Sequence, residues 1–144
     1  MAEDHRSISG YAFLIDSGTV SWSSKQQEIV SLSTTKREYI AVMHGGKEAL
    51  WLCSLISEVF GPITLPTTLF SDNQAAIALT HDHQYHPCTK HIDMQYHWIR
   101  WVVEKGSIQL IYCLTDDMVA DALTKVLPSA KVKHFAVSLG LCVK

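Results

Sequence analysis

The stretch TTLFSDNQAAIAL, residues 67–79, reads as a short strand that ends at a carboxylate and turns at once into a helix. Its first four residues are β-branched or apolar, which favours a strand. Ser71, Asp72 and Asn73 are turn and N-cap residue types, and the QAAIAL that follows has good helix propensity. A carboxylate at the end of a buried strand faces the sheet edge where α/β proteins bind ligands. Asp72 is therefore a candidate site residue, with helix N-capping as the alternative.

Two further carboxylates occur in ordered settings. Glu38 lies early in a helix predicted over residues 33–60, where apolar residues recur at helical spacing. Asp121 lies near the start of a helix predicted over residues 118–125. One Glu and two Asp on rigid elements suit a hard, oxygen-preferring cation such as Mg²⁺. Taken singly, Glu38 and Asp121 are more typical of solvated helix carboxylates.

The rest of the pattern alternates strands and helices. Residues 10–15 and 19–23 read as a hairpin around a turn at 16–18. Further helices are predicted over residues 73–80, 92–104 and 132–139, and a strand over residues 108–112. With 144 residues, 47% of them hydrophobic and 18% charged, the chain is predicted to form one globular domain, residues 1–144, of the α/β class.

Composition also excludes several classes of protein. No apolar run approaches the roughly 20 residues of a membrane span. The first residues lack a signal-peptide core, so we expect a cytoplasmic or nuclear protein rather than a secreted one. Four irregularly spaced cysteines argue against a disulfide framework. The His-rich loop at residues 81–91 fits no known zinc-finger spacing, so a polar, substrate-facing loop is preferred over a zinc site.

Six ordered motifs closely resemble the ribonuclease H domain of copia-type LTR retrotransposon polyproteins. They are SGY at residues 9–11, SWSSKQ at 21–26, SLSTT at 31–35 with Glu38 and Tyr39, SDN at 71–73, KHID at 90–93 and ADALTK at 120–125. The match runs from about residue 4 to about residue 141 without large gaps. Its order and spacing make the resemblance specific.

This resemblance implies a ribonuclease H-like fold, in which helices flank a mixed five-stranded sheet. It also implies hydrolysis of the RNA strand of an RNA–DNA hybrid with two Mg²⁺ ions, or Mn²⁺. Matched motif by motif, Glu38, Asp72 and Asp121 would be both the metal ligands and the catalytic residues.

Charge is uneven along the chain, which permits a nucleic-acid face. Residues 1–85 carry five Lys and Arg against nine Asp and Glu, whereas residues 86–144 carry seven against five. Phosphate attraction depends on such basic groups. Four side chains are candidate phosphate contacts, with a solvated surface as the alternative: Lys90, His91, Arg100 and Lys125.

One departure from the family changes the expectation. The family carries its first catalytic Asp on a central strand that begins more than ten residues before the SGY motif, but eight residues precede Ser9 here. The first strand and its Asp are thus expected to be missing, and hydrolysis by an isolated monomer to be weak or absent. The alternatives are a non-catalytic nucleic-acid-binding or oligomerising module, or a surface repurposed for an unrelated activity.

The missing strand would also leave backbone groups unpaired along residues 10–15 and 69–71. Exposed strand edges are templates for further pairing. We therefore expect a homo-oligomer that dimerises or swaps through this gap, or direct pairing of the two remaining sheet segments.

Overall fold

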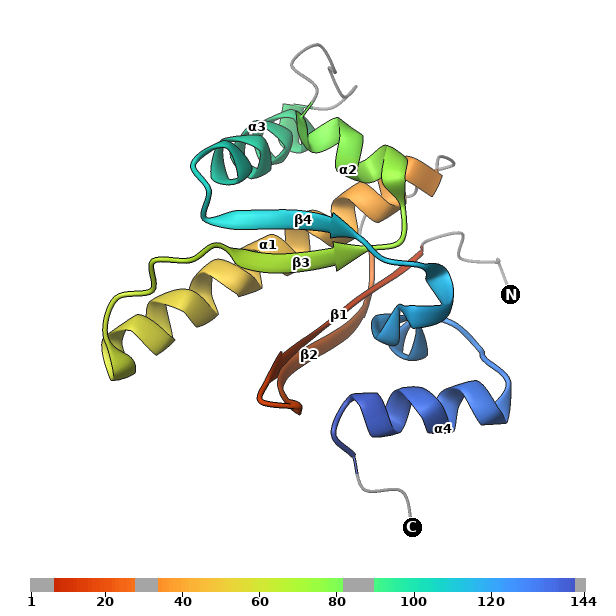
Figure 1. Ribbon diagram of the computed structural model, residues 1–144. Helices are drawn as coiled ribbons and strands as arrows, with labels where there is room; N and C mark the ends of the chain where they lie inside the picture. Colours follow the sequence, from red (N-terminus) through yellow and green to blue (C-terminus); the bar gives the residue numbers. More distant parts are fainter. Residues whose placement is uncertain (1–6, 28–33, 82–89, 142–144) are drawn as a thin grey trace.

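The computed structural model describes residues 7–27, 34–81 and 90–141, with the backbone alone for residues 90–96. These residues form a mixed α/β protein in which small sheets are flanked by helices (Figure 1), so the α/β prediction is confirmed. The elements follow in the order β1 (Ile8–Ile15), β2 (Gly18–Gln26), α1 (Thr34–Phe60), β3 (Thr67–Ser71), α2 (Gln74–His81), α3 (Lys90–Glu104), β4 (Ile108–Tyr112), η1 (Thr115–Asp117), η2 (Val119–Leu123) and α4 (Ser129–Ser138). In this part of the chain, no helix combines the length and apolar content needed to cross a membrane.

Strands β1 and β2 form the predicted hairpin. Its turn places Asp16 and Ser17 at φ of 50° and 68°, in the left-handed region. Two such residues between paired strands make the tight turn whose twist matches that of the strands, and Asp tolerates this backbone better than most residues. The register pairs Ile15 with Gly18 and shifts once, between Phe13 and Leu14.

The described strands form two separate sheets. β1 pairs antiparallel with β2, and β3 pairs parallel with β4. The prediction of one mixed sheet is therefore wrong for these strands, and so is the alternative that the two sheet segments pair directly. The physical reason is spacing: strands pair at about 4.8 Å, and side chains of α1 hold β1 and β3 on either side of a cavity.

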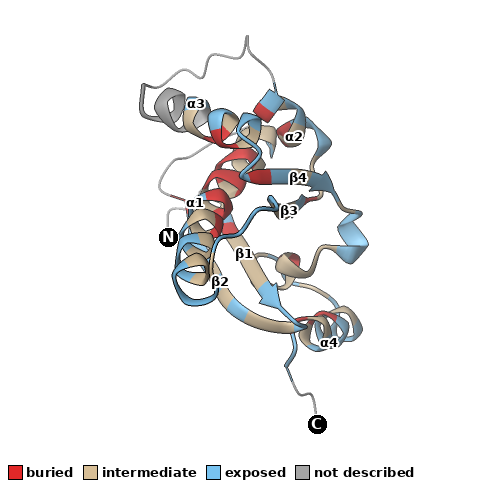
Figure 2. Ribbon diagram, turned by 60° about the vertical axis from the view of Figure 1, so that its left-hand side comes forward, coloured by how far each residue is buried: buried red, intermediate tan, exposed pale blue. Residues whose placement is uncertain are grey.

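Helix α1 carries the core. Its buried face presents Tyr39, Met43 and Ala49, each at most 2% exposed. Against it pack buried side chains from the elements around β4: Ala76, Ile99, Val102 and Ile108. Figure 2 shows this buried segment along the middle of α1. The far end of α1 projects from the core, and Phe60 is 83% exposed there.

The two adjacent glycines of α1 differ in the space around them. A Cβ at Gly45 would lie 4.0 Å from Tyr11 Cβ, an ordinary contact, whereas one at Gly46 would lie 2.7 Å from Ile99 Cδ1. Ile99 is fully buried and has little room to move. Substitution by alanine should therefore have different effects on stability at the two positions.

We expect Gly45→Ala to raise the free energy of unfolding by about 0.5–1 kcal/mol, because alanine restricts the unfolded chain and favours helix. Gly46→Ala should gain less or be destabilising, since its methyl group must displace Ile99. Urea unfolding of the two variants measures the difference. Equal stability of both would contradict the packing described for Gly46.

The segment after β4 differs from the prediction. Residues 118–125 were expected to be one helix, but the structure has short 3₁₀ turns, η1 and η2, with i→i+3 bonds such as Thr124 N to Asp121 O. The segment is too short for a stable α-helix in isolation, and it is shaped by its neighbours instead. Helix α4 follows, anchored by the buried Phe135.

Candidate functional site

A cavity of about 1110 Å³ lies between the two sheets. We call it the slot: its sides are β1 and β3, its floor is α1, and η2 with the residues around it closes one end. Most of its lining is apolar, with Ala41, Val42 and Gly45 contributed by α1. The slot therefore occupies the space between the two sheets.

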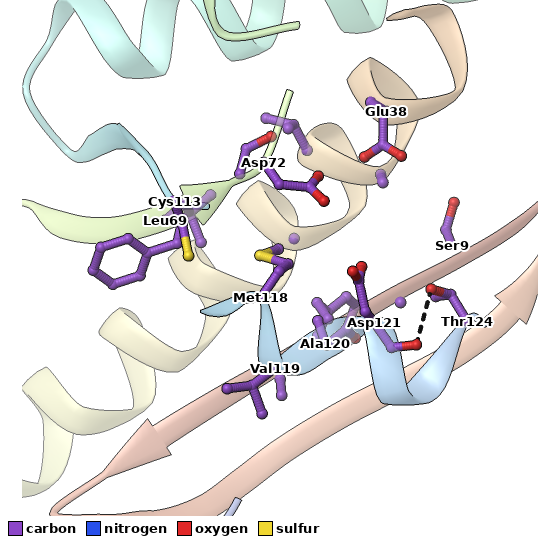
Figure 3. Close-up of a pocket in the computed structure, with 18 of the residues that line it drawn as sticks. Ser9, Glu38, Leu69, Asp72, Cys113, Met118, Val119, Ala120, Asp121 and Thr124 are labelled. Atoms are coloured by element: carbon purple, nitrogen blue, oxygen red, sulfur yellow. Dashed lines mark hydrogen bonds between the residues drawn. The ribbon is translucent and has the colours of Figure 1, made fainter. Parts of the chain in front are cut away.

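The three candidate carboxylates all lie at one end of the slot. Glu38 comes from the start of α1, Asp72 directly follows β3, and Asp121 belongs to η2. Figure 3 shows their carboxyl groups pointing toward one another from these three elements. Among the described residues, however, no three His, Cys, Asp or Glu side chains are grouped closely enough to hold one ion. The carboxylates thus face a common space without contact.

The three carboxylates affect one another electrostatically. Burial raises the pKa of Glu38, and the charge of Asp72 raises it further, while Lys125 opposes the effect. Burial also raises the pKa of Asp121, which Lys125 opposes through its charge and a hydrogen bond. Lys125 Nζ lies 3.3 Å from Asp121 Oδ2. Like charges in a partly buried site repel one another, and a cation placed among them would relieve that repulsion.

Asp72 is not the N-cap of α2. The cap is Asn73, whose Oδ1 accepts a hydrogen bond from the backbone N–H of Ala76 at 2.9 Å. Ser71 Oγ accepts a bond from the Asn73 N–H at 3.3 Å. Asn73 therefore performs the N-capping that was the alternative role for Asp72. The Asp72 carboxylate points toward Glu38 and Asp121 instead (Figure 3).

Three further polar residues line the slot near the carboxylates without having been predicted. Ser9 Oγ accepts a hydrogen bond from Gln27 Nε2 at 2.6 Å, and the same amide donates to the Arg37 carbonyl. Gln27 Oε1 and Arg37 Nε are buried and have no hydrogen-bond partner among the described residues. Gln27 and Arg37 carry no motif, so nothing in the sequence marked them.

Cys113 also lines the slot. Its pKa is raised, first by burial and then by the charge of Asp117, so the group stays a thiol at neutral pH. Cys53 and Cys113 are both free and partly buried. A neutral thiol is a poor ligand for a hard cation. We therefore assign Cys113 to the wall of the slot.

The structure describes the side chains of two of the four candidate phosphate contacts, and these two lie apart. Lys125 lies at the carboxylate end of the slot. Arg100 lies on α3, outside the slot lining, with Nε 4.0 Å from Glu104 Oε1. The side chains of Lys90 and His91 lie outside the described residues, as do residues 82–89 of the loop considered for zinc. The structure thus brings Lys125 to the carboxylates and leaves Arg100 elsewhere.

The site is thus an acidic group at one end of the slot in an α/β protein. The chain has relatives among Pol polyproteins. The chain is 42% identical over 129 residues to the retrovirus-related Pol polyprotein from transposon TNT 1-94 of Nicotiana tabacum, and the match covers 90% of this chain and 10% of the relative. It is 35% and 34% identical over 139 residues to those from transposons RE1 and RE2 of Arabidopsis thaliana, covering 96% of this chain and 10% of each relative.

The chain spans about a tenth of the length of these relatives. No protein-family profile matches it, and neither does any solved structure. Its homologues are retrovirus-related Pol polyproteins from plant transposons, which is consistent with a domain from a copia-type retrotransposon.

Proposed function

We propose that this chain is a ribonuclease H-like domain derived from a retrotransposon, which acts on the RNA strand of RNA–DNA hybrids with reduced activity. The observation that supports the proposal is the arrangement of Glu38, Asp72 and Asp121, which reach one end of one cavity from three separate elements. Three carboxylates seldom share a partly buried space without a cation to offset their repulsion.

The donor chemistry fits Mg²⁺ or Mn²⁺. Carboxylate oxygens are the preferred protein ligands of both ions, and Glu38, Asp72 and Asp121 would hold them. Such ions, when bound, would activate the attacking water and stabilise the leaving oxygen. Among the described residues these three carboxylates are not grouped closely enough to hold one ion together, which is why we propose reduced activity.

The remaining residues of the site would position the substrate. Lys125 lies beside Asp121 and is about half exposed, so it could turn toward a phosphate once a cation offsets the carboxylate charge. Arg37 Nε is buried, has no hydrogen-bond partner among the described residues, and could donate to an oxygen that enters the slot. Both groups would hold the backbone of a nucleic acid rather than read its sequence.

A non-catalytic module that binds nucleic acid is the second candidate. It is favoured by the absence, among the described residues, of three ligands grouped around one point. Such a module would bind hybrids in a salt-dependent way through its basic groups, without a need for a divalent ion.

Cleavage of a labelled RNA–DNA hybrid separates the two functions. We expect slow cleavage that is faster with Mn²⁺ than with Mg²⁺, because Mn²⁺ tolerates an incomplete and less regular ligand set. Duplex DNA and duplex RNA of the same sequence serve as control substrates. Hybrid binding without cleavage in either ion would favour the non-catalytic module.

A further inference from the structure

The second half of helix α1 has an exposed face that the slot does not use. We call it the outer stripe, and its members are Lys47, Trp51, Ser54, Leu55, Glu58 and Val59. At 3.6 residues per turn these positions fall on one side of the helix. Ala49, which belongs to the core, lies on the opposite side. All six members of the outer stripe are exposed, although the same helix carries the core on its other side.

The outer stripe is unusually apolar for a solvated helix face. Trp51 is 59% exposed, Leu55 44% and Val59 65%. Together they expose roughly 300 Å² of side chain, if a large apolar side chain carries about 150–250 Å². A patch of this size is comparable with the largest apolar patches on typical monomers, which are often functional. Tryptophan is also strongly enriched among the residues that dominate binding at interfaces.

The charges of the outer stripe indicate the kind of partner. Lys47 begins it, and Glu58 lies near its other end, about 16 Å away along the helix axis. Neither forms an ion pair with another described residue. If a second copy of α1 lies antiparallel, each Lys47 faces the Glu58 of the other copy across a two-fold axis. A parallel copy would place like charges opposite one another, which is unfavourable.

The same register brings the apolar side chains together. Residue 51 then lies opposite residue 54, so the Trp51 ring of each copy packs over the small Ser54 of the other and beside Leu55. With the aliphatic stems of Lys47 and Glu58, each copy would bury roughly 500–600 Å². The total of about 1,000–1,200 Å² lies near the lower limit for a specific interface. The dimer is therefore expected to be weak and reversible.

We propose that the outer stripe is a homodimer interface, in which α1 packs antiparallel against α1 of a second copy. Trp51 and Leu55 supply apolar contact, and the pairing of Lys47 with Glu58 sets the orientation. Glu38 lies about 25 Å from Leu55 along the helix, so the dimer leaves both slots open. This inference does not depend on nuclease activity, because no member of the outer stripe lines the slot.

Sedimentation equilibrium of the unmodified chain is the first test. We expect a reversible monomer–dimer equilibrium, with half of the chains dimeric at about 10–100 μM, as suits an interface of this size. A protein that stays strictly monomeric through this range would leave the outer stripe to a different partner and reject the proposal.

Charge reversal tests the orientation. Lys47→Glu makes both ends of the outer stripe acidic, and Glu58→Lys makes both ends basic. Each variant alone should self-associate at least about tenfold more weakly, because two attractive pairs become repulsive. An equimolar mixture of the two variants should dimerise nearly as well as the unmodified chain, since acidic ends then face basic ends. A mixture that does not regain association would reject the antiparallel pairing.

The matched control for charge is Lys133→Glu, which makes the same change at an exposed position of α4. It should leave the dimer affinity unchanged. A loss equal to that of Lys47→Glu would show that net charge, and not the outer stripe, controls association, and would overturn the proposal.

Two tryptophan variants locate the contact. Trp51→Ala should weaken self-association at least about tenfold, because the ring is lost from both copies. Trp22→Ala removes a similarly exposed ring from β2, where Trp22 is 64% exposed, and should leave the affinity unchanged. Circular dichroism checks that both variants are folded. Unchanged association in Trp51→Ala, or equal losses in the two variants, would place the contact elsewhere and reject the outer stripe.

Discussion

Asp72→Asn is expected to lower hybrid cleavage by at least about 100-fold while raising the stability of the metal-free protein. Loss of an outer partner of a metal ligand already costs about 10–100-fold in affinity or activity, and Asp72 is proposed as a ligand itself. Asparagine keeps the size of the side chain, and Asn73 still caps α2. The local fold should therefore survive the change.

The rise in stability follows from the charge of Asp72, which raises the pKa of Glu38. A carboxyl whose pKa is higher in the folded state binds more protons there, so folding is disfavoured as pH rises above its unfolded pKa. Removing the Asp72 charge lowers the pKa of Glu38 and so reduces this destabilisation at neutral pH. Melting with a chelator should give a higher temperature for Asp72→Asn than for wild type, and the difference should shrink below about pH 4, where carboxyls are protonated.

The matched control is Asp116→Asn. Asp116 is exposed, pairs with Lys131 at 3.2 Å and lies outside the slot lining. It should change neither cleavage nor stability much, because exposed ion pairs contribute about 0–1 kcal/mol. Cleavage that persists in Asp72→Asn would show that the reaction takes place elsewhere than at this end of the slot. A fall in melting temperature would instead contradict the repulsion inferred for Glu38.

Phe135→Ala is expected to destabilise the protein by about 3–5 kcal/mol, the usual cost of removing a large buried aromatic side chain. Phe135 is fully buried, and among the described residues of α4 it is the one in the buried class. Such a loss is a large fraction of the stability of a typical domain. Urea unfolding should show it as a lower midpoint.

The comparison variant lies on the same helix. Val137 is 64% exposed, so Val137→Ala should change the free energy of unfolding by less than about 0.5 kcal/mol. α4 packs against η2, which carries Asp121. Phe135→Ala should therefore also weaken metal binding at temperatures where the rest of the protein stays folded. Equal effects of the two variants would show that α4 is not anchored by Phe135.

Local sequence patterns predicted the elements well. The helical spacing of apolar residues over residues 33–60 predicted α1, and the turn residues at 16–18 predicted the hairpin. These features depend on residues close together in the chain. The helix predicted around Asp121 became a 3₁₀ turn, because packing against β1 and α4 shapes so short a segment more than its own propensity does.

The site was predicted in part. Glu38, Asp72 and Asp121 were named from their motifs, and the structure brings them to one cavity. Gln27 and Arg37 could not be found in this way. What singles them out is one buried atom each, Gln27 Oε1 and Arg37 Nε, without a hydrogen-bond partner among the described residues, and this has no local signature in the sequence. The separation of the two sheets could not be predicted from the sequence either, because tertiary contacts decide which distant strands pair.

Helix α1 contacts both β1 and β3, and no backbone hydrogen bond joins those strands in the described structure. Side-chain packing, in which α1 contacts both sheets, therefore sets the distance between them. Hydrogen-bonded strands have a single preferred spacing, but a gap bridged by side chains can widen or narrow gradually. Asp72 directly follows β3, and Asp121 lies on η2, which packs against β1. The separation of these two carboxylates therefore depends on the packing between the sheets and not on a hydrogen-bonded ladder.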